Sequence, residues 1–348
     1  MPVIFLSFIS RKILISAIFL LFLLSFQQVF AADSVCELDS ANREWIKKTV
    51  DAWEKVREHS LYISSHKLPR LILFDESCVW NINANSAEFS AKNAAKGKIV
   101  LNKKSYAFFA SKHEGKIALP ENGEIPAQLL TFAATYENGE KAFLVSAMPS
   151  IWRKAPHLQD EKNVETLIKS VFVHEMTHTF HHKYHAKLNV IEKTLQDAEN
   201  FDDDIIQDIF GKNEEFKKAY EKEHELLFQA VGEKDLTKKR KLAKAVYEKI
   251  QARRKQFFTN ENAVYEELEE IFLTMEGAGN WAAYKSAMNQ GMNETDALKL
   301  IRRSEKYWSQ DEGIGLFLLI DALFPKWQKK AFGNSQMSVT DLLGEALK

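Results

Sequence analysis

Apolar side chains recur at helical spacing near the start of this chain and then give way to short alternating or β-branched runs. Between Ser40 and His59, the residues Trp45, Val50 and Trp53 share one helical face, and Ser40 is a suitable cap, so we expect a helix there. Strands are predicted at four places: Arg70–Phe74, Lys98–Asn102, Gln128–Tyr136 and Lys141–Met148. The tripeptide Glu137-Asn138-Gly139 between the last two predicts a hairpin turn.

The second half of the chain is patterned almost wholly for helices. Pro156 interrupts the chain before a helix that we expect to begin near residues 160–163. A stretch rich in Lys and Glu from Asn213 to about Phe258 predicts two antiparallel helices joined by a turn at Gly232–Asp235, with a solvated charged surface. Further helices are predicted at Ala263–Glu276, Thr295–Ser309, Gly315–Phe332 and Val339–Leu347. The pattern therefore predicts an α+β fold, with a small mixed sheet followed by a larger helical part.

The N-terminus has the form of a secretory signal. Arg11 and Lys12 precede an apolar run, Ile13–Phe26, which is too short to span a membrane comfortably. Small residues that end at Ala31 offer a cleavage site, so we predict that residues 1–31 are a signal peptide. An uncleaved N-terminal anchor is the alternative. The expected location is periplasmic or secreted.

The cysteine count and the net charge bear on the expected disulfide and on the class of binding partner. The chain has two cysteines, Cys36 and Cys78, and an exported protein with an even count favours a disulfide over two free thiols. Closing this loop would contribute at most roughly 4 kcal/mol. The formal net charge is −1, without the basic excess that nucleic-acid binding requires. No other segment is long and apolar enough to span a membrane, and the oligomeric state stays open.

The sequence His-Glu-Met-Thr-His occupies residues 174–178, within an apolar helical pattern. Histidines four apart lie on one helical face, so His174 and His178 can bind a single metal ion. Glu175 lies beside that ion, where a carboxylate can take a proton from a metal-bound water. The motif therefore predicts one catalytic Zn²⁺. A buried helix whose histidines only satisfy each other and nearby carbonyls is the alternative.

Catalytic zinc usually takes a third protein ligand and leaves one position for water. Glu276 is the first candidate, because the small residues at 277–279 let its backbone approach another helix closely. A glycine inside a helix costs about 1 kcal/mol relative to alanine, which suggests a packing or site reason for this run. Glu269, on nearly the same helical face, and its neighbour Glu270 are the rivals; Glu269 could instead orient a ligand histidine.

Further histidines follow the motif. His181, His182 and His185 are expected on the same helix, and His181 would lie about 10 Å along the axis from His174. It cannot reach the ion unless the helix breaks, so we expect it on the surface, lining the cleft or supporting a ligand. The metzincin pattern places a glycine at position 181, so it does not fit this chain.

Residues 171–180 resemble the extended signature of the zincin superfamily. In that signature the positions between the motif residues are uncharged, and a hydrophobic residue ends the run, as Phe180 does here. The run from Glu276 resembles the Glu-Gly-x-Ala segment of gluzincins, the group that includes thermolysin and the alanyl aminopeptidases. In that group this Glu is the third zinc ligand. Ala278 and Gly279 do not reproduce the segment in full, so the rivals of Glu276 stay open.

The resemblance implies a zincin-like fold with the active site in a cleft between two lobes. The expected division is an N-terminal α/β lobe, residues 32–160, and a helical lobe that carries the metal, residues 161–348. In zincins an edge strand just before the metal helix pairs with the bound peptide. Lys141–Met148 is the best match in position, and an ordinary interior strand is the alternative.

These residues predict a zinc-dependent peptidase that acts on a peptide or protein substrate. The oxyanion of its tetrahedral intermediate needs a donor besides the metal. Tyr284 is the first candidate for that role, and Tyr265, Tyr307 and His224 are alternatives. Two other functions stay open: a periplasmic binding or assembly protein that cuts nothing, and a zinc hydrolase of a non-peptide amide or ester.

Overall fold

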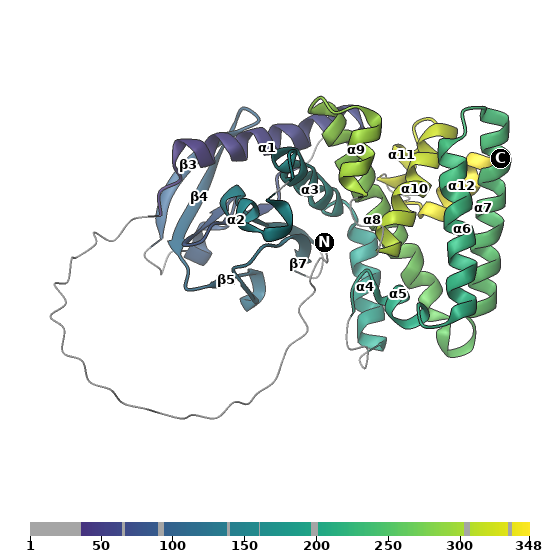
Figure 1. Cartoon of the computed structure of the whole chain (residues 1–348). Coiled ribbons are helices and arrows are strands. Elements are labelled where there is room, and N and C mark those ends of the chain that lie inside the picture. Colours follow the sequence, from purple (N-terminus) through teal and green to yellow (C-terminus); the bar gives the residue numbers. More distant parts are fainter. Residues whose placement is uncertain are drawn as a thin grey trace.

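The computed structural model describes residues 36–64, 67–89, 94–137, 140–159, 161–195, 201–302, 307–332 and 336–348. The predicted signal peptide, 1–31, lies outside these residues, as do Asn138 and Gly139 of the predicted hairpin turn. None of the helices in the described ranges combines the length and apolar character needed to cross a lipid bilayer. A small mixed sheet occupies one side of the protein, and a larger helical region occupies the other (Figure 1).

The main sheet has six strands in the order β3-β4-β2-β1-β8-β7. Their bounds are β1 Arg70–Phe74, β2 Cys78–Ile82, β3 Ala95–Leu101, β4 Lys104–Lys112, β7 Thr131–Tyr136 and β8 Lys141–Ala147. The sheet is mixed because β1 pairs antiparallel with β2 and parallel with β8. A separate ribbon pairs β5 Lys116–Ala118 with β6 Glu124–Pro126. The predicted mixed sheet is confirmed, but β2 and β4 were not anticipated.

The predicted edge position of Lys141–Met148 is wrong. Its strand, β8, ends at Ala147 and lies between β1 and β7, so the alternative of an interior strand is correct. The last strand of the order, next to the helix that carries the histidine motif, is β7. Strand order depends on pairing between distant segments, and position along the chain does not determine it.

Helix α1, Ser40–His59, lies along the sheet and has the predicted bounds (Figure 1). Its cap is Asp39 rather than Ser40, since the Asp39 carboxylate accepts a hydrogen bond from the Asn42 backbone N–H. The apolar face that predicted the helix, Trp53 included, is buried. The helix contacts both long helices that hold the candidate site, α3 (Val164–His178) and α8 (Val264–Asn289).

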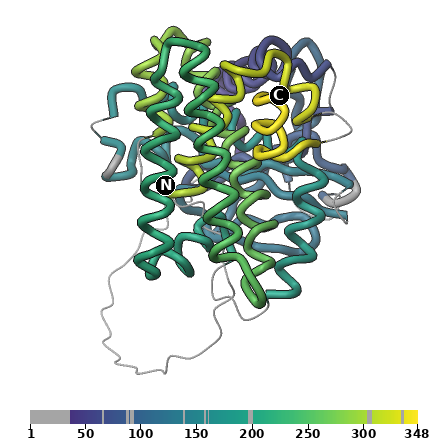
Figure 2. The backbone as a smooth tube through the Cα atoms, turned by 90° about the vertical axis from the view of Figure 1, so that its right-hand side faces the viewer, coloured from purple at the N-terminus to yellow at the C-terminus, as the bar shows by residue number. Residues whose placement is uncertain are grey.

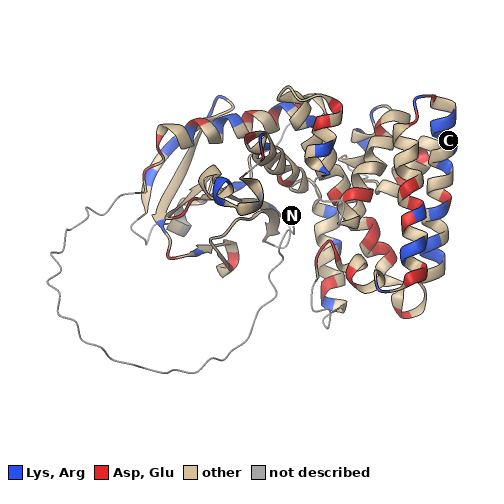
Figure 3. Cartoon of the chain, in the orientation of Figure 1, with Lys and Arg blue, Asp and Glu red and all other residues tan. Residues whose placement is uncertain are grey.

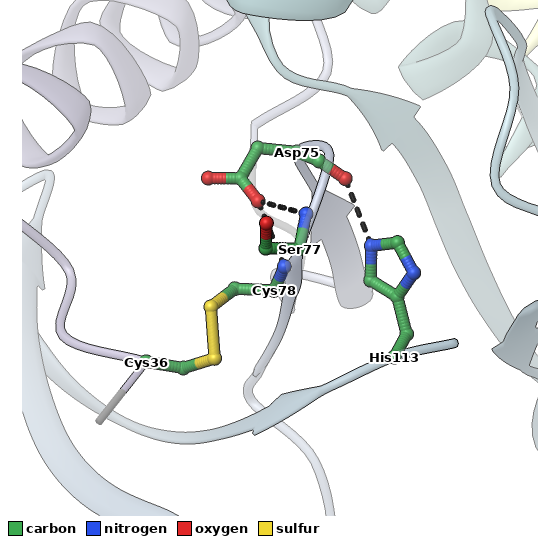
Figure 4. The surroundings of a disulfide bond; sticks show 5 residues. All are labelled: Cys36, Asp75, Ser77, Cys78 and His113. Atoms are coloured by element: carbon green, nitrogen blue, oxygen red, sulfur yellow. Dashed lines mark hydrogen bonds between the residues drawn. A yellow bond between two sulfur atoms is a disulfide. The ribbon is translucent and has the colours of Figure 1, made fainter. Parts of the chain in front are cut away.

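Cys36 and Cys78 form the predicted disulfide, with a Cα–Cα distance of 5.7 Å (Figure 4). The bond ties the chain before α1 to the first residue of β2. The turn that carries Cys78 is braced by Asp75, whose carboxylate accepts hydrogen bonds from the backbone N–H groups of Ser77 and Cys78. The ring of His113 contacts the Asp75 carbonyl. A disulfide is typical of an oxidising, extracellular-type environment.

The helical region is built around α8. The other helices are α2 Pro149–Lys154, α4 His182–Thr194, α5 Ile205–Phe210, α6 Glu214–Gly232, α7 Leu236–Phe257, α9 Glu294–Ile301, α10 Trp308–Leu323, α11 Gln328–Ala331 and α12 Val339–Leu347. Short 3₁₀ turns occur at Ser86–Phe89, Pro120–Asn122, Pro156–Leu158 and Asn260–Asn262. The predicted antiparallel pair is confirmed as α6 and α7 (Figure 2). Predicted boundaries of three helices are wrong: α8 does not end at Glu276, α9 ends at Ile301 and not at Ser309, and α10 runs from Trp308 to Leu323 and not from Gly315 to Phe332.

Helix α8 continues past Glu276 because its glycines are packed against another helix. A Cβ atom on Gly277 would lie 2.6 Å from the carbonyl oxygen of Gly313 on α10. One on Gly313 would lie 2.8 Å from the Gly277 Cα atom. The two backbones therefore touch at this crossing, and the packing compensates for the low helix propensity of glycine.

One cluster of buried apolar side chains runs from α1 and the sheet through α3 and α8 to α10 and α12. A smaller cluster lies among α4, α5, α6 and α8. Helices α3 and α8 are therefore central, with the sheet on one side and the helical region on the other (Figure 1).

The charged stretch from α6 to α7 is only partly the solvated surface that we predicted (Figure 3). Arg253 and Arg254 of α7 are buried. Arg253 forms ion pairs with Glu223, Glu269 and Glu312, whereas Arg254 pairs with Glu269 and Glu270. This network joins α6, α7, α8 and α10.

Candidate metal centre

Four of the predicted site residues meet where α3 packs against α8. His174, Glu175 and His178 come from the last turns of α3, and Glu276 comes from the middle of α8. All four are buried, with exposed fractions of 7%, 3%, 5% and 7% in that order. Helical spacing places both imidazoles on the side of α3 that faces α8.

The three candidate ligands have the spacing of a metal site. Nε2 of His174 and Nε2 of His178 lie 2.9 Å apart, and each lies 3.3 Å from an oxygen of Glu276. A tetrahedral zinc ion with bonds of about 2.0–2.1 Å separates its ligand atoms by about 3.3 Å. The group formed by His174, His178 and Glu276 could therefore hold one metal ion.

The pKa shifts of His174 and Glu276 also indicate that a cation would be stabilised between these side chains. Burial alone would lower the pKa of His174, but the Glu276 carboxylate outweighs it and raises that pKa to about 9. Burial would raise the pKa of Glu276, yet His178 and His174 hold it below its usual value. Glu276 Oε2 is buried and has no hydrogen-bond partner. A metal ion would satisfy this oxygen; without one, a proton on a histidine would have to do so.

Glu175 points toward the neighbouring sheet strand. Its Oε2 accepts a hydrogen bond of 3.0 Å from the Ala133 backbone N–H of β7. Burial raises the pKa of Glu175, while His174 and His178 act in the opposite direction. A carboxylate whose pKa is raised by burial is better suited to accept a proton near neutral pH.

Of the three glutamates considered as the third ligand, Glu269 and Glu270 form contacts away from the two histidines. Glu269 is held by the guanidinium groups of Arg253 and Arg254. Glu270 binds Arg254 and also accepts hydrogen bonds from the backbone and hydroxyl of Thr340. Both rivals are engaged elsewhere, and only Glu276 is brought to the two histidines.

The prediction that the motif helix continues through His181 and His185 is wrong. Helix α3 ends at His178, and α4 begins at His182. No glycine causes the break. Thr177 and Thr179 donate their hydroxyls to the carbonyls of Val173 and Met176, and hydroxyl hydrogen bonds of this kind often bend a helix. His181 consequently turns back, and its Nδ1 lies 3.4 Å from Nδ1 of His178.

Asn280 is a site residue that the sequence reasoning missed. Its Oδ1 lies 3.0 Å from Nδ1 of His174, and its Nδ2 donates to the Gln310 carbonyl. This contact fixes the orientation of the His174 ring, as hydrogen-bonded partners of metal ligands commonly do. The available signal was its spacing, since Asn280 is one helical turn after Glu276.

The four candidates for oxyanion stabilisation lie in different places. Tyr284 is about 12 Å along α8 from Glu276. Burial, Glu294 and Asp321 raise its pKa to about 12. The ring of Tyr265 packs against Phe210, and His224 is bound to Asp311.

Tyr307, the fourth candidate, interacts with two aspartates. Burial, Asp204 and Asp203 raise the pKa of Tyr307. Burial raises the pKa of both aspartates as well, to about 7 for Asp204, and the charge of Glu276 contributes to each shift.

No family model, no curated protein and no solved structure matches this chain. The site is therefore interpreted from its own geometry and from the sequence motif.

Replacing Gly279 with alanine is expected to disturb the His174 ring directly. A Cβ atom there would lie 2.8 Å from Nδ1 and 2.9 Å from Nε2 of His174. We expect Gly279→Ala to weaken zinc binding by about 10- to 100-fold, as loss of ligand orientation does, in a competition titration with a chelator. Gly344→Ala on α12 is the matched control, because its nearest contact would be an ordinary 3.8 Å. Equal zinc affinity in both variants would contradict this role for Gly279.

Proposed function

We propose that this protein is a zinc-dependent hydrolase, and more specifically a gluzincin-like metallopeptidase. The observation that carries the proposal is the convergence of His174, His178 and Glu276 at ligand spacing, with Glu175 next in the chain to a ligand. Its support from sequence is the resemblance of residues 171–180 to the zincin signature.

The proposed roles follow from the positions of the side chains. His174, His178 and Glu276 would hold Zn²⁺, which supplies a Lewis acid and lowers the pKa of a bound water. Glu175 would act as the general base that accepts a proton from the attacking water, and it would return this proton to the leaving amine of the cleaved peptide. Asn280 keeps the His174 ring in its binding orientation.

We propose that the substrate is a peptide that adds to the sheet as an extended strand. Strand β7 replaces Lys141–Met148 in this role, because β7 ends the strand order and its Ala133 contacts Glu175. An added strand gains its affinity from main-chain hydrogen bonds, while pockets for alternate side chains supply specificity. The disulfide supports a periplasmic or secreted location.

Metal analysis of the purified protein tests the proposal. We expect about one zinc ion per wild-type chain, loss of peptide hydrolysis on addition of a chelator, and recovery when zinc is restored. Glu276→Ala should lose zinc, because a buried ligand is removed. Glu267→Ala, which removes a partly exposed carboxylate of the same helix, is the matched control. A wild-type chain that holds no metal contradicts the proposal.

The alternative functions give different results in the same experiment. Zinc binding without turnover of any peptide in a library would indicate a binding or assembly protein. Zinc-dependent cleavage of amides or esters, but of no peptide, would indicate a non-peptide hydrolase. Glu175 favours catalysis, because a protein that only binds has no need of a carboxylate beside the metal.

A further inference from the structure

A histidine that binds zinc through Nε2 must carry its proton on Nδ1, and that N–H group needs an acceptor. His174 has Asn280 in this position. The group opposite Nδ1 of His178 is Nδ1 of His181, within hydrogen-bonding distance at 3.4 Å. His181 lies at the corner between α3 and α4, where it could orient the His178 ring or only pack between the two helices.

The packing around His181 holds its ring in one orientation. His181 is 1% exposed. Its ring stacks on Phe332, with centroids 5.5 Å apart and planes 20° apart, and meets the ring of Tyr184 edge-on at 5.9 Å. The ring therefore presents Nδ1 to His178 without freedom to turn away.

Gln336, which precedes α12, forms hydrogen bonds at the corner between α3 and α4. Gln336 donates from its side-chain amide to the Phe180 carbonyl and accepts from the Lys183 backbone N–H. Its own carbonyl accepts from the Tyr184 hydroxyl. Gln336 adopts a left-handed backbone conformation with φ of 38°, which is strained for a side chain of this type. Three contacts from one strained residue indicate that the position of this corner is tightly specified.

We propose that His181 is a positioning residue for the metal site. Its Nδ1 accepts the hydrogen bond of His178 Nδ1–H, which selects the tautomer and ring orientation that leave Nε2 of His178 free to bind the ion. The inference rests on the metal site proposed above. It requires His181 to be neutral, with its own proton on Nε2, because a proton on Nδ1 would remove the acceptor.

This arrangement also sets the charge of the site. Ligand histidines are often held by carboxylates, which add negative charge and make the ligand a stronger donor. Here both partners, Asn280 and His181, are uncharged acceptors. Glu276 would then be the single anionic ligand, and the ion would keep more of its positive charge for polarising a carbonyl or a water.

The test compares two substitutions of His181 that differ in one property. His181→Phe retains an aromatic ring but removes the acceptor, and His181→Asn restores an oxygen near the position of Nδ1. We expect the Phe variant to raise the zinc dissociation constant by about 10- to 100-fold and the Asn variant to stay close to wild type. His182→Phe, at the exposed neighbouring position, should have no effect. Equal affinity in wild type and both His181 variants, with the fold intact, overturns the proposal.

A second measurement does not depend on bound metal or on the folding of any variant. Nitrogen NMR of the metal-free wild-type protein should show a proton on Nδ1 of His178. A His178 ring without a proton on Nδ1 overturns the proposal. Zinc binding that depends on His181 in a protein without peptidase activity would support positioning while refuting the proposed function. A wild-type protein that binds no zinc would refute both.

Discussion

Glu175→Gln is expected to keep zinc in place and to lower kcat for peptide cleavage by about 10²- to 10⁴-fold. The amide has the shape of the carboxylate and still offers an oxygen to the Ala133 N–H, so the helix and its two histidines should not move. It cannot accept the proton of a metal-bound water. The measurement is steady-state hydrolysis of a peptide library together with zinc content.

Glu165→Gln is the matched control for this prediction, because it makes the same change at an exposed position of α3. It should leave kcat and zinc content unchanged. Full activity in the Glu175→Gln variant would show that the proposed mechanism is wrong, whereas loss of zinc would show that Glu175 shapes the site instead of accepting a proton.

Arg253→Met is expected to destabilise the protein by about 3–5 kcal/mol, the usual effect of removing one partner of a buried ion pair. Arg253 is 2% exposed, and the change leaves the carboxylates of Glu223 and Glu269 without this counter-charge. Burial and the charge of Glu223 raise the pKa of the third acid, Glu312, well above its usual value. Chemical denaturation with a chelator present measures the effect without a contribution from metal.

Lys244→Met removes a positive charge from the exposed surface of the same helix and serves as the comparison. Its side chain is 70% exposed and lies 4.0 Å from Glu248, a pair that contributes at most about 1 kcal/mol. We expect a change within about 0.5 kcal/mol for this variant. Similar denaturation midpoints for the two variants would show that the buried network does not stabilise the helical region.

Local patterns predicted the parts of the fold that depend on local interactions. The bounds of α1, β1 and α12 follow from periodicity and were predicted as found. Strands β2 and β4 were missed for different reasons. In β2 the polar residue Asn81 interrupts the apolar run. It is buried in the structure, where its side chain accepts hydrogen bonds from Arg70 of β1. In β4 the exposed and buried positions do not alternate.

Contacts between distant segments account for the remaining differences. The order of β7 and β8 in the sheet is decided by the parallel pairing of β8 with β1. Helix α8 was predicted to end at Glu276, just before its glycines, and glycine weakens an isolated helix. The contact of Gly277 with Gly313, which belongs to another helix, reverses that expectation.

The site was predicted in part for similar reasons. His174, Glu175 and His178 form a local motif, and Glu276 was ranked first by the small residues that follow it. The structure brings His174, His178 and Glu276 together, with Glu175 next to His174 on α3. Helical periodicity could not reveal the break after His178, because the apolar pattern carries no signal for the hydroxyl–carbonyl hydrogen bonds found at this end of α3.

The position of β7 at the end of the sheet has a consequence for which polypeptides could be cut. A chain that adds to this strand must lie extended over several residues, and its backbone groups must be free of other partners. Segments inside native helices or sheets meet that condition only after local unfolding. The thermodynamic stability of a target around its cleavage point would then govern its lifetime: tails, loops and damaged proteins would be degraded, and intact neighbours would survive.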